Sequence, residues 1–553
     1  MRDPLAQING AATPQTKPIP GRAQVRNAAG GYVFGKDDWT RVEDFLILGT
    51  TGGTYYVSAD ALTETNVEVL HEALAVDGPR LVSLITDIST ARPPRAPRPR
   101  PAVFALALAA AQGDAATRQA VKAAFPKVVR TTDHLAMFFG YWKNLGGKPN
   151  ARGGTSPVLG RAMRTTLSSF FTGDDVHSVA FRALKARQRS TPTGEEMALR
   201  DVVRLAHPAG PTDAHRALIG WLAGRVSDDE ARALVPDIDD FLTAQAVTSP
   251  AEAIRAVLDR RVPWEFLPSE VLGDAAVWTE LATTIGLTAL LRNLARMTRI
   301  GTLAPFAAAT DRVVGRLTDA AAIARARIHP MDVYLALKTY ASGRSQPDRR
   351  KPVTTWQPVG SIVDALEQAY ENSFGSVEPS GRRLLVGVDS SGSMSSQHAQ
   401  VVVGGSPLGT PYEVACTMAV MLTRIEHGNI AVIDVDTVVH PSSVTARSSL
   451  REIAQWKPSG GGTDLSLPFT WAHNQQLTVD GILVLTDNET WAGRQHPVQA
   501  LETYRRSGNP AVRVVVVSLT AAGYSIADAR DEGVLHVAGL DASLPTLITG
   551  FVR

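Results

Sequence analysis

Apolar residues recur at helical spacing through most of the chain before residue 345. From residue 102 onward, alanine- and leucine-rich segments alternate with short breaks, and no convincing strand pattern interrupts them. Antiparallel helices of this number and length are typical of α-solenoids, and because no strict sequence period is present, we expect degenerate repeats. The predicted helices cover residues 41–49, 66–75, 78–89, 103–111, 115–125, 134–142, 160–171, 176–185, 195–205, 213–223, 251–258, 278–292, 317–326 and 330–341.

The pattern changes after residue 383, where apolar strands alternate with helices. The run Leu384–Asp389 is apolar up to its final aspartate, which predicts a strand buried on both faces. Strands that alternate with helices in this way build a doubly wound α/β domain with a mainly parallel sheet. The segments that carry the pattern are residues 384–389, 412–426, 430–436, 450–455, 481–487, 498–505, 512–519, 534–540 and 545–552.

The chain has 553 residues, which is too long for one hydrophobic core. We expect a flexible N-terminal tail over residues 1–27, which are rich in Ala, Gln, Pro and Gly without periodicity. The helical domain then covers residues 28–360, and the α/β domain covers residues 361–553.

An arginine- and proline-rich segment interrupts the helical domain. Residues 91–101 carry four arginines and five prolines, a composition that cannot form a helix. We interpret this segment as a solvated surface loop, and the alternative is an arm that touches RNA.

Composition narrows the cellular setting but not the function. The net charge is +2, so any basic binding site must be local. The single cysteine, Cys416, cannot form an intramolecular disulfide, which favours a reducing compartment. The N-terminus lacks the apolar region of a signal peptide, and no uncharged apolar run of about 18 residues occurs. We therefore expect a cytoplasmic protein without a membrane segment.

Oxygen-bearing side chains follow two of the predicted strands. Asp389, Ser391 and Ser393 come directly after the first strand, and Asp487 follows another. Thr463 lies in a glycine-rich loop between them. Because the carboxyl ends of parallel strands share one edge of a sheet, these side chains can converge there. Mg²⁺ fits best, since it prefers oxygen ligands in octahedral geometry and keeps several waters.

Two other interpretations of this cluster stay open. The aspartates could only cap helices, with the loop packed without metal, or the ion could be catalytic. The site has no histidine and no obvious general base for water. The chain also has no Walker loop, nucleophile elbow, zinc-type His/Cys cluster or paired acidic nuclease motif. We therefore expect no enzymatic activity.

The five oxygen donors resemble, residue for residue, the metal-ion-dependent adhesion site of von Willebrand factor A domains. That resemblance implies direct binding by the serines, direct or water-mediated binding by Thr463, and water-mediated contacts for the aspartates, with one position open for a partner's carboxylate. A narrower resemblance, to the Ro autoantigen family with its TROVE module, covers roughly residues 38–553. It is carried by residues 52–56 (GGTYY), 287–294 (LTALLRNL), 326–330 (ARIHP), 461–468 (GGTDLSLP), 486–493 (TDNETWAG) and 524–528 (YSIAD).

The Ro resemblance implies a monomeric ring of HEAT-like helical repeats that a von Willebrand factor A domain closes. Such rings bind small structured Y RNAs on their outer surface and take single-stranded ends of misfolded RNAs into the central hole. Bacterial members of the family are associated with stress survival and RNA maturation or decay, in one case alongside the exoribonuclease polynucleotide phosphorylase.

A local excess of basic residues agrees with an RNA partner. Residues 120–210 hold 14 Lys and Arg against 6 Asp and Glu, whereas the whole chain is nearly balanced. Such a band can neutralise phosphates, or it can be a set of solvated helix faces. The predicted helix from Gly160 adds Arg161 and Arg164, which lie three residues apart and so on nearby faces.

The resemblance selects residues within this band. Segments that contribute to Y RNA binding in the animal proteins correspond here to residues 185–189 and 204–207. The implied contacts are Lys185, Arg187, Arg189, Arg204 and His207. The chain departs from the animal pattern in a longer segment after residue 189 and in an alanine at position 206, so the contacts could shift, and Arg161 and Arg164 could line the hole instead. Phe139, Tyr141 and Trp142 could stack on bases, but we favour core packing.

Two functions from different classes remain. The first is a non-catalytic RNA-binding ring that acts in RNA quality control and the stress response. The second is a Mg²⁺-dependent protein-recognition scaffold whose metal ion captures a partner's carboxylate. The two can coexist in one molecule.

Overall fold

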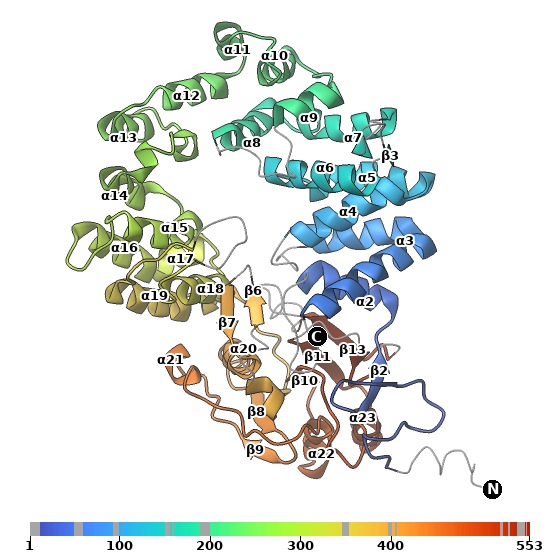
Figure 1. The fold of residues 1–553 in the computed structure, drawn as a ribbon. Helices are drawn as coiled ribbons and strands as arrows, with labels where there is room; N and C mark the ends of the chain where they lie inside the picture. Colours follow the sequence, from blue (N-terminus) through green and yellow to red (C-terminus); the bar gives the residue numbers. More distant parts are fainter. Residues whose placement is uncertain are drawn as a thin grey trace.

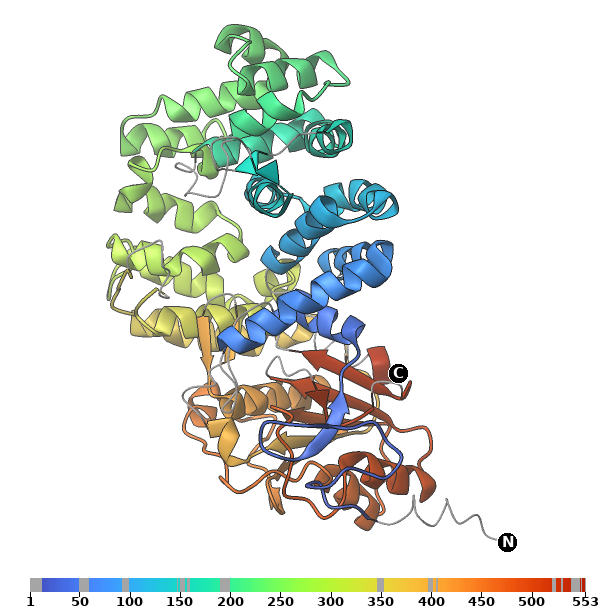
Figure 2. The same cartoon turned by 45° about the vertical axis from the view of Figure 1, so that its right-hand side comes forward.

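The computed structural model describes residues 12–48, 59–91, 99–146, 148–149, 155–156, 160–188, 199–345, 353–395, 401–403, 406–519, 524–528, 531–538, 548 and 550–552. A curved array of helices forms most of a ring, and the α/β domain joins its two ends (Figure 1). Seen from 45° away, the helical array stands above the α/β domain (Figure 2). No described helix combines the length and apolar character needed to cross a membrane.

The helices of the array are amphipathic and mostly short. In α15, for example, Leu287, Leu290, Leu294 and Met297 are buried at helical spacing. The array comprises α2 (Asp38–Leu48), α3 (Ala59–Thr90), α4 (Arg100–Gln112), α5 (Ala115–Val128), α6 (Thr132–Gly146), α7 (Arg161–Thr172), α8 (Val176–Gln188), α9 (Leu199–Ala206), α10 (Asp213–Leu222), α11 (Asp228–Leu234), α12 (Pro236–Gln245), α13 (Pro250–Leu258), α14 (Ala275–Thr284), α15 (Leu287–Arg299), α16 (Ala308–Thr318), α17 (Ala320–Arg325), α18 (Pro330–Ala341) and α19 (Gly360–Asn372).

Several predicted boundaries were wrong. The helix predicted over residues 278–292 is two helices, because Ile285 and Gly286 have extended backbone between α14 and α15. The helix predicted over residues 317–326 is also divided, because the Asp319 carboxylate accepts from Ala322 N and caps α17. Helices α11 and α12 and all but the last two residues of α16 were outside the predicted helices.

The arginine- and proline-rich segment is only partly described. Arg100 and Pro101, which were assigned to a loop, open helix α4, where a proline in the first turn costs no hydrogen bond. Residues 92–98 lie outside the described residues. Two short strands, β3 (Lys148–Pro149) and β4 (Thr155–Ser156), interrupt the helical part and were not predicted.

The α/β domain contains the predicted doubly wound sheet. Its strand order is β13-β11-β10-β5-β8-β9, and every pair is parallel except β8 with β9. Its strands are β5 (Leu384–Asp389), β8 (Ile430–Val435), β9 (Val439–Pro441), β10 (Gly481–Thr486), β11 (Arg513–Ser518) and β13 (Val534–Ala538). Its helices are α20 (Pro411–Ile425), α21 (Leu450–Ile453), α22 (Leu467–Asn474) and α23 (Pro497–Arg506). Strand β6 (Val401–Val403) pairs antiparallel with β7 (Ser406–Gly409).

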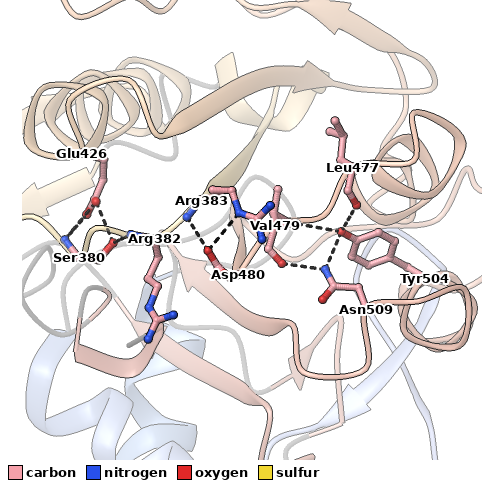
Figure 3. Close-up of polar contacts among 9 residues, drawn as sticks. All are labelled: Ser380, Arg382, Arg383, Glu426, Leu477, Val479, Asp480, Tyr504 and Asn509. Atoms are coloured by element: carbon pink, nitrogen blue, oxygen red, sulfur yellow. Dashed lines mark hydrogen bonds and ion pairs between the residues drawn. The ribbon is translucent and has the colours of Figure 1, made fainter.

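Polar contacts fix the starting points of the two central strands (Figure 3). Arg383 directly precedes β5, and Asp480 directly precedes β10. The backbone N of Arg383 donates to Asp480 Oδ2 at 2.8 Å. Asn509 Nδ2 donates to Val479 O at 2.7 Å and to Tyr504 Oη at 2.8 Å. Strands β5 and β10 are each six residues long and fully buried, so fixing their starts also fixes where they end.

Both ends of the helical array contact the α/β domain. At the last helices, Tyr334 of α18 donates to Leu408 O of β7 at 3.3 Å, and Lys338 forms an ion pair with Glu413 of α20. At the first helix, α2 packs beside β13, and the buried Lys36 ammonium pairs with Asp44. One continuous cluster of buried apolar residues therefore extends from Val42 through the helices into the sheet.

The N-terminal segment corrects the prediction of a flexible tail for residues 12–27. Strand β1 (Val25–Arg26) pairs with β2 (Tyr32–Gly35), and β2 pairs with β12 (Tyr524–Ser525) in the α/β domain. Ile19 is buried in a small cluster with Phe34 and Val498 of α23. Composition alone did not indicate this order, because the partners in the α/β domain, Tyr524–Ser525 and Val498, lie hundreds of residues away. Residues 1–11 lie outside the described residues.

Gly387, in the middle of β5, makes the packing of this strand testable. An added Cβ would lie 2.6 Å from Pro468 Cγ and 3.8 Å from Leu483 O, so Gly387→Ala overpacks the core. We expect the free energy of unfolding to fall by about 1–3 kcal/mol, measured by urea denaturation with tryptophan fluorescence. Gly375→Ala is the matched control, because nothing lies within 4 Å of its added Cβ. Equal stabilities of the two variants would contradict this packing.

Candidate metal centre and basic surface

The ends of β5 and β10 bring two aspartates together at the carboxyl edge of the sheet. Val388 pairs with Leu485, so Asp389 lies opposite the end of β10. Thr486 Oγ1 donates to Asp389 Oδ2 at 2.7 Å, and Asp487 follows immediately. All three residues are at most 2% exposed. The sequence prediction placed both aspartates at this edge, whereas the role of the Thr486 hydroxyl was missed.

The segment after β5 folds back over the strand end. Ser391 N donates to Asp389 Oδ1 at 3.0 Å, and the hydroxyls of Ser391 and Ser393 lie 3.2 Å apart. The short 3₁₀ helix η4 (Gly392–Ser395) holds Ser393, whose hydroxyl hydrogen-bonds to Asp487. These contacts bring four of the five predicted donors into one buried cluster.

The glycine-rich loop carries the fifth predicted donor, Thr463, to the same edge. Gly392 N donates to Gly461 O at 3.1 Å, and Gly460 N donates to Ser390 O at 3.0 Å. Gly460 has φ of +88°, a conformation that glycine adopts without strain. Trp491 N donates to Thr463 O at 2.9 Å, so the loop is bonded both to the segment after β5 and to the segment after β10.

Electrostatics make this cluster unfavourable for two ionised carboxylates on their own. Burial, reinforced by the charge of Asp487, raises the pKa of Asp389 to about 7. Burial also raises the pKa of Asp487 above its ordinary value. A divalent cation would compensate both charges and would accept the serine and threonine oxygens as ligands.

The donor set therefore fits a hard cation such as Mg²⁺. Among the described residues, no group of three or more His, Cys, Asp or Glu is arranged to hold a metal, so a site here depends on its hydroxyl oxygens. Two nearby acidic residues are directed to other partners. Asp464 Oδ1 accepts from Gln15 Nε2 at 2.8 Å and from Ser466 Oγ at 2.6 Å, and Glu489 accepts from Tyr524 Oη.

Four of the predicted RNA-contacting residues are exposed, and three of them, Arg161, Arg164 and His207, have no described side-chain contact and lie on neighbouring elements. Arg161 and Arg164 lie on α7, and His207 follows the end of α9 with φ of +48°. Ser168 Oγ, one helical turn beyond Arg164, donates to Arg164 O at 2.7 Å and lies 3.3 Å from Ala206 O. The arginine-bearing face of α7 therefore lies beside the end of α9. We call these three residues the α7–α9 basic surface.

The other predicted residues are engaged within the protein or are not described. Lys185 Nζ lies 3.0 Å from Glu265 Oε1 and over the ring of Phe181. Arg204 donates from Nη2 to Ala223 O at 3.1 Å. Arg189 and the side chain of Arg187 lie outside the described residues.

The aromatic residues near this band pack in the protein interior, as the sequence analysis favoured. Phe139 is 0% and Trp142 is 7% exposed, and their ring centroids lie 5.6 Å apart. Tyr141 is half-buried, meets Phe104 edge-on and accepts from Arg100 Nε at 2.7 Å. Stabilisation of α4 and α6 accounts for these side chains.

Comparisons with known proteins agree with this architecture. Residues 383–552 match the family described as the Ro60 vWA domain, and residues 247–339 match the TROVE domain. The chain is 36% identical over 557 residues to RNA-binding protein RO60 of Deinococcus radiodurans, covering 100% of this chain and 99% of that protein. It is 29% identical over 606 residues to RNA-binding protein RO60 of Caenorhabditis elegans, covering 96% of this chain and 90% of that protein.

A solved structure is similar over nearly the same length. The crystal structure of the Deinococcus radiodurans RO (RSR) protein aligns with a TM-score of 0.67 and 35% identity, covering 94% of this chain and 99% of that chain. The predicted fold class, a helical-repeat ring with a von Willebrand factor A domain, is thereby confirmed. These similarities extend over both domains, and the chain belongs to the Ro60 family.

Proposed function

We propose that this protein is a non-catalytic RNA-binding ring. The observation that carries the proposal is the 36% identity, over the whole chain, to a protein named for RNA binding. The α7–α9 basic surface adds a physical reason, because exposed guanidinium groups can pair with phosphates. Unlike Lys185 and Arg204, the two α7 arginines are free to reach a ligand without breaking a described side-chain contact.

Helix α7 lies on the outer side of the array in Figure 1. This position supports binding of a folded RNA from outside the ring, and we propose a small structured noncoding RNA of the Y type. The resemblance to Ro proteins supports a second mode, in which a single-stranded end of a misfolded RNA enters the centre of the ring. From the same resemblance we propose roles in RNA quality control and in the stress response.

We further propose that Asp389, Ser391, Ser393, Thr463 and Asp487 hold one Mg²⁺ ion. The bound ion would supply a positive charge and an open coordination position at the edge of the sheet. Neither carboxylate is left over as a general base, because both face the cluster that would hold the ion. The site therefore supports docking better than catalysis.

A specific observation favours protein recruitment as a second role of this site. Trp491 is 39% exposed, and its Cζ2 would lie 3.0 Å from a Cβ added to Gly462, beside Thr463. Val438, in the adjoining loop, is 53% exposed. Apolar side chains beside a cation suit a partner segment that combines a carboxylate with apolar residues. In an RNA-decay role, that partner would be an exoribonuclease such as polynucleotide phosphorylase.

The α7–α9 basic surface gives the first test of this proposal. Arg161→Ala with Arg164→Ala should weaken binding of a structured RNA with a single-stranded tail. Each lost phosphate contact should reduce, by about 1, the slope of the logarithm of the binding constant against the logarithm of the salt concentration. Fluorescence anisotropy across a salt series measures both quantities. The matched control is Arg312→Ala with Arg325→Ala, which removes two exposed charges from α16 and α17. An equal loss in both double variants would contradict a local binding surface.

The proposed metal site predicts a pH-dependent stabilisation by Mg²⁺. The folded-state pKa of Asp389 lies above its ordinary value of 3.8, so without a cation this group stabilises the fold less as the pH rises toward about 7. Mg²⁺ binds the ionised form, so its increase in melting temperature should be larger at pH 8 than at pH 6. Differential scanning fluorimetry measures this, with Asp389→Asn as the variant that should lose the increase. A similar increase in melting temperature with Asp389→Asn would show that Mg²⁺ binds outside the proposed site.

A further inference from the structure

The segment that follows β10 is held from outside the α/β core by the N-terminal segment. Asn27 Nδ2 donates to Thr490 O at 2.8 Å, and Ala29 N donates to Glu489 Oε2 at 3.0 Å. A Cβ at Gly31 would collide with the Thr490 carbonyl oxygen, so the two backbones are in direct contact. We call residues 12–31 the brace and residues 487–493, which begin with Asp487, the metal loop.

Gln15 connects two of the three segments of the proposed metal site. Its side chain is buried, with 0% exposure, and both the oxygen and the nitrogen of its amide form hydrogen bonds. Oε1 accepts from Thr490 Oγ1 at 2.6 Å in the metal loop, and Nε2 donates to Asp464 Oδ1 at 2.8 Å, next to Thr463. The backbone contributes as well, because Gln15 N donates to Gly493 O at 3.0 Å.

The same brace is continuous with the start of the ring. Residues 32–35 form β2, which pairs with β12, and α2 begins at Asp38. The brace, which contacts the metal loop up to Gly31, is therefore separated from the first helix of the array only by the short strand β2 and its flanking residues. In both ribbon views the dark blue N-terminal segment lies against the α/β domain (Figures 1 and 2).

We propose that the brace positions the metal loop, so that binding of the divalent cation and docking of the brace favour each other. The inference rests on the proposed metal site. Its physical basis is that Asp487 and Thr463 must be held at fixed separation to share one ion. Gln15 is bonded to Asp464, next to Thr463, and to Thr490, three residues after Asp487. Because coupling between two sites is reciprocal, the cation must also hold the brace more firmly on the domain.

Metal affinity of brace variants tests the first half of this coupling. Mn²⁺ would be titrated into the full chain, and binding would be measured by calorimetry and electron paramagnetic resonance. The variants Gln15→Ala and Asn27→Ala should each bind Mn²⁺ at least about fivefold more weakly than the wild type. Arg22→Ala is the control, because its ion pair joins the brace to Glu502 of α23 rather than to the metal loop. It should bind Mn²⁺ as the wild type does, and circular dichroism should show unchanged helix content in all variants.

Proteolysis tests the reciprocal effect, in which the bound cation holds the brace more firmly on the domain, and it needs no substitution in the brace. Mg²⁺ should slow tryptic cleavage after Arg22 and Arg26, and Asp389→Asn should abolish this protection. Cleavage that is indifferent to Mg²⁺, or Mn²⁺ affinities that are equal in Gln15→Ala and the wild type, would overturn the coupling while leaving the metal site in place. A wild type that binds no Mn²⁺ would overturn both, and equal weakening in Arg22→Ala would show that the effect is not specific to the metal loop.

Discussion

A solenoid of helices exposes an apolar face at each of its ends, and here one α/β domain covers both. The first helix, α2, packs beside β13 and is buried at Val42 and Leu46. At the other end, the buried Tyr334 donates to Leu408 O of β7, and Arg424 of α20 lies over the buried Tyr370. An open array would leave these faces in water, at a cost of about 1.5–3 kcal/mol for each large side chain. Closing the ring removes that cost, because one domain covers both ends of the array.

Closure also determines where the functional elements lie. Because the domain must reach both ends, its sheet is fixed relative to the helices, and the carboxyl edge with Asp389 and Asp487 has a defined place in the molecule. The basic surface on α7 and α9 belongs to the far part of the array (Figure 1). The proposed RNA surface and the proposed metal site therefore lie at separate places on the molecule.

Local signals in the sequence were sufficient for the central strands and the candidate metal donors. The apolar run that ends at Asp389 and the run that ends before Asp487 are each buried on both faces, so their composition predicts strands directly. The helix break at Ile285 and Gly286 was missed because apolar spacing continues across it. The role of Gln15 could not be predicted, because its partners Asp464 and Thr490 are 449 and 475 residues away. Lys185 and Arg204 carry the right charge, and only the structure shows that Glu265 and Ala223 already engage them.

The RNA that accompanies the protein tests the account most directly. The full chain would be purified from its own cells after crosslinking, and the bound RNA would be sequenced against total RNA, with Arg161→Ala plus Arg164→Ala as the comparison. We expect small structured noncoding RNAs to be strongly enriched with the wild type and to be depleted with the double variant. Bound RNA that matches the total pool, or enrichment that is unchanged in the double variant, would contradict RNA recognition through the α7–α9 basic surface.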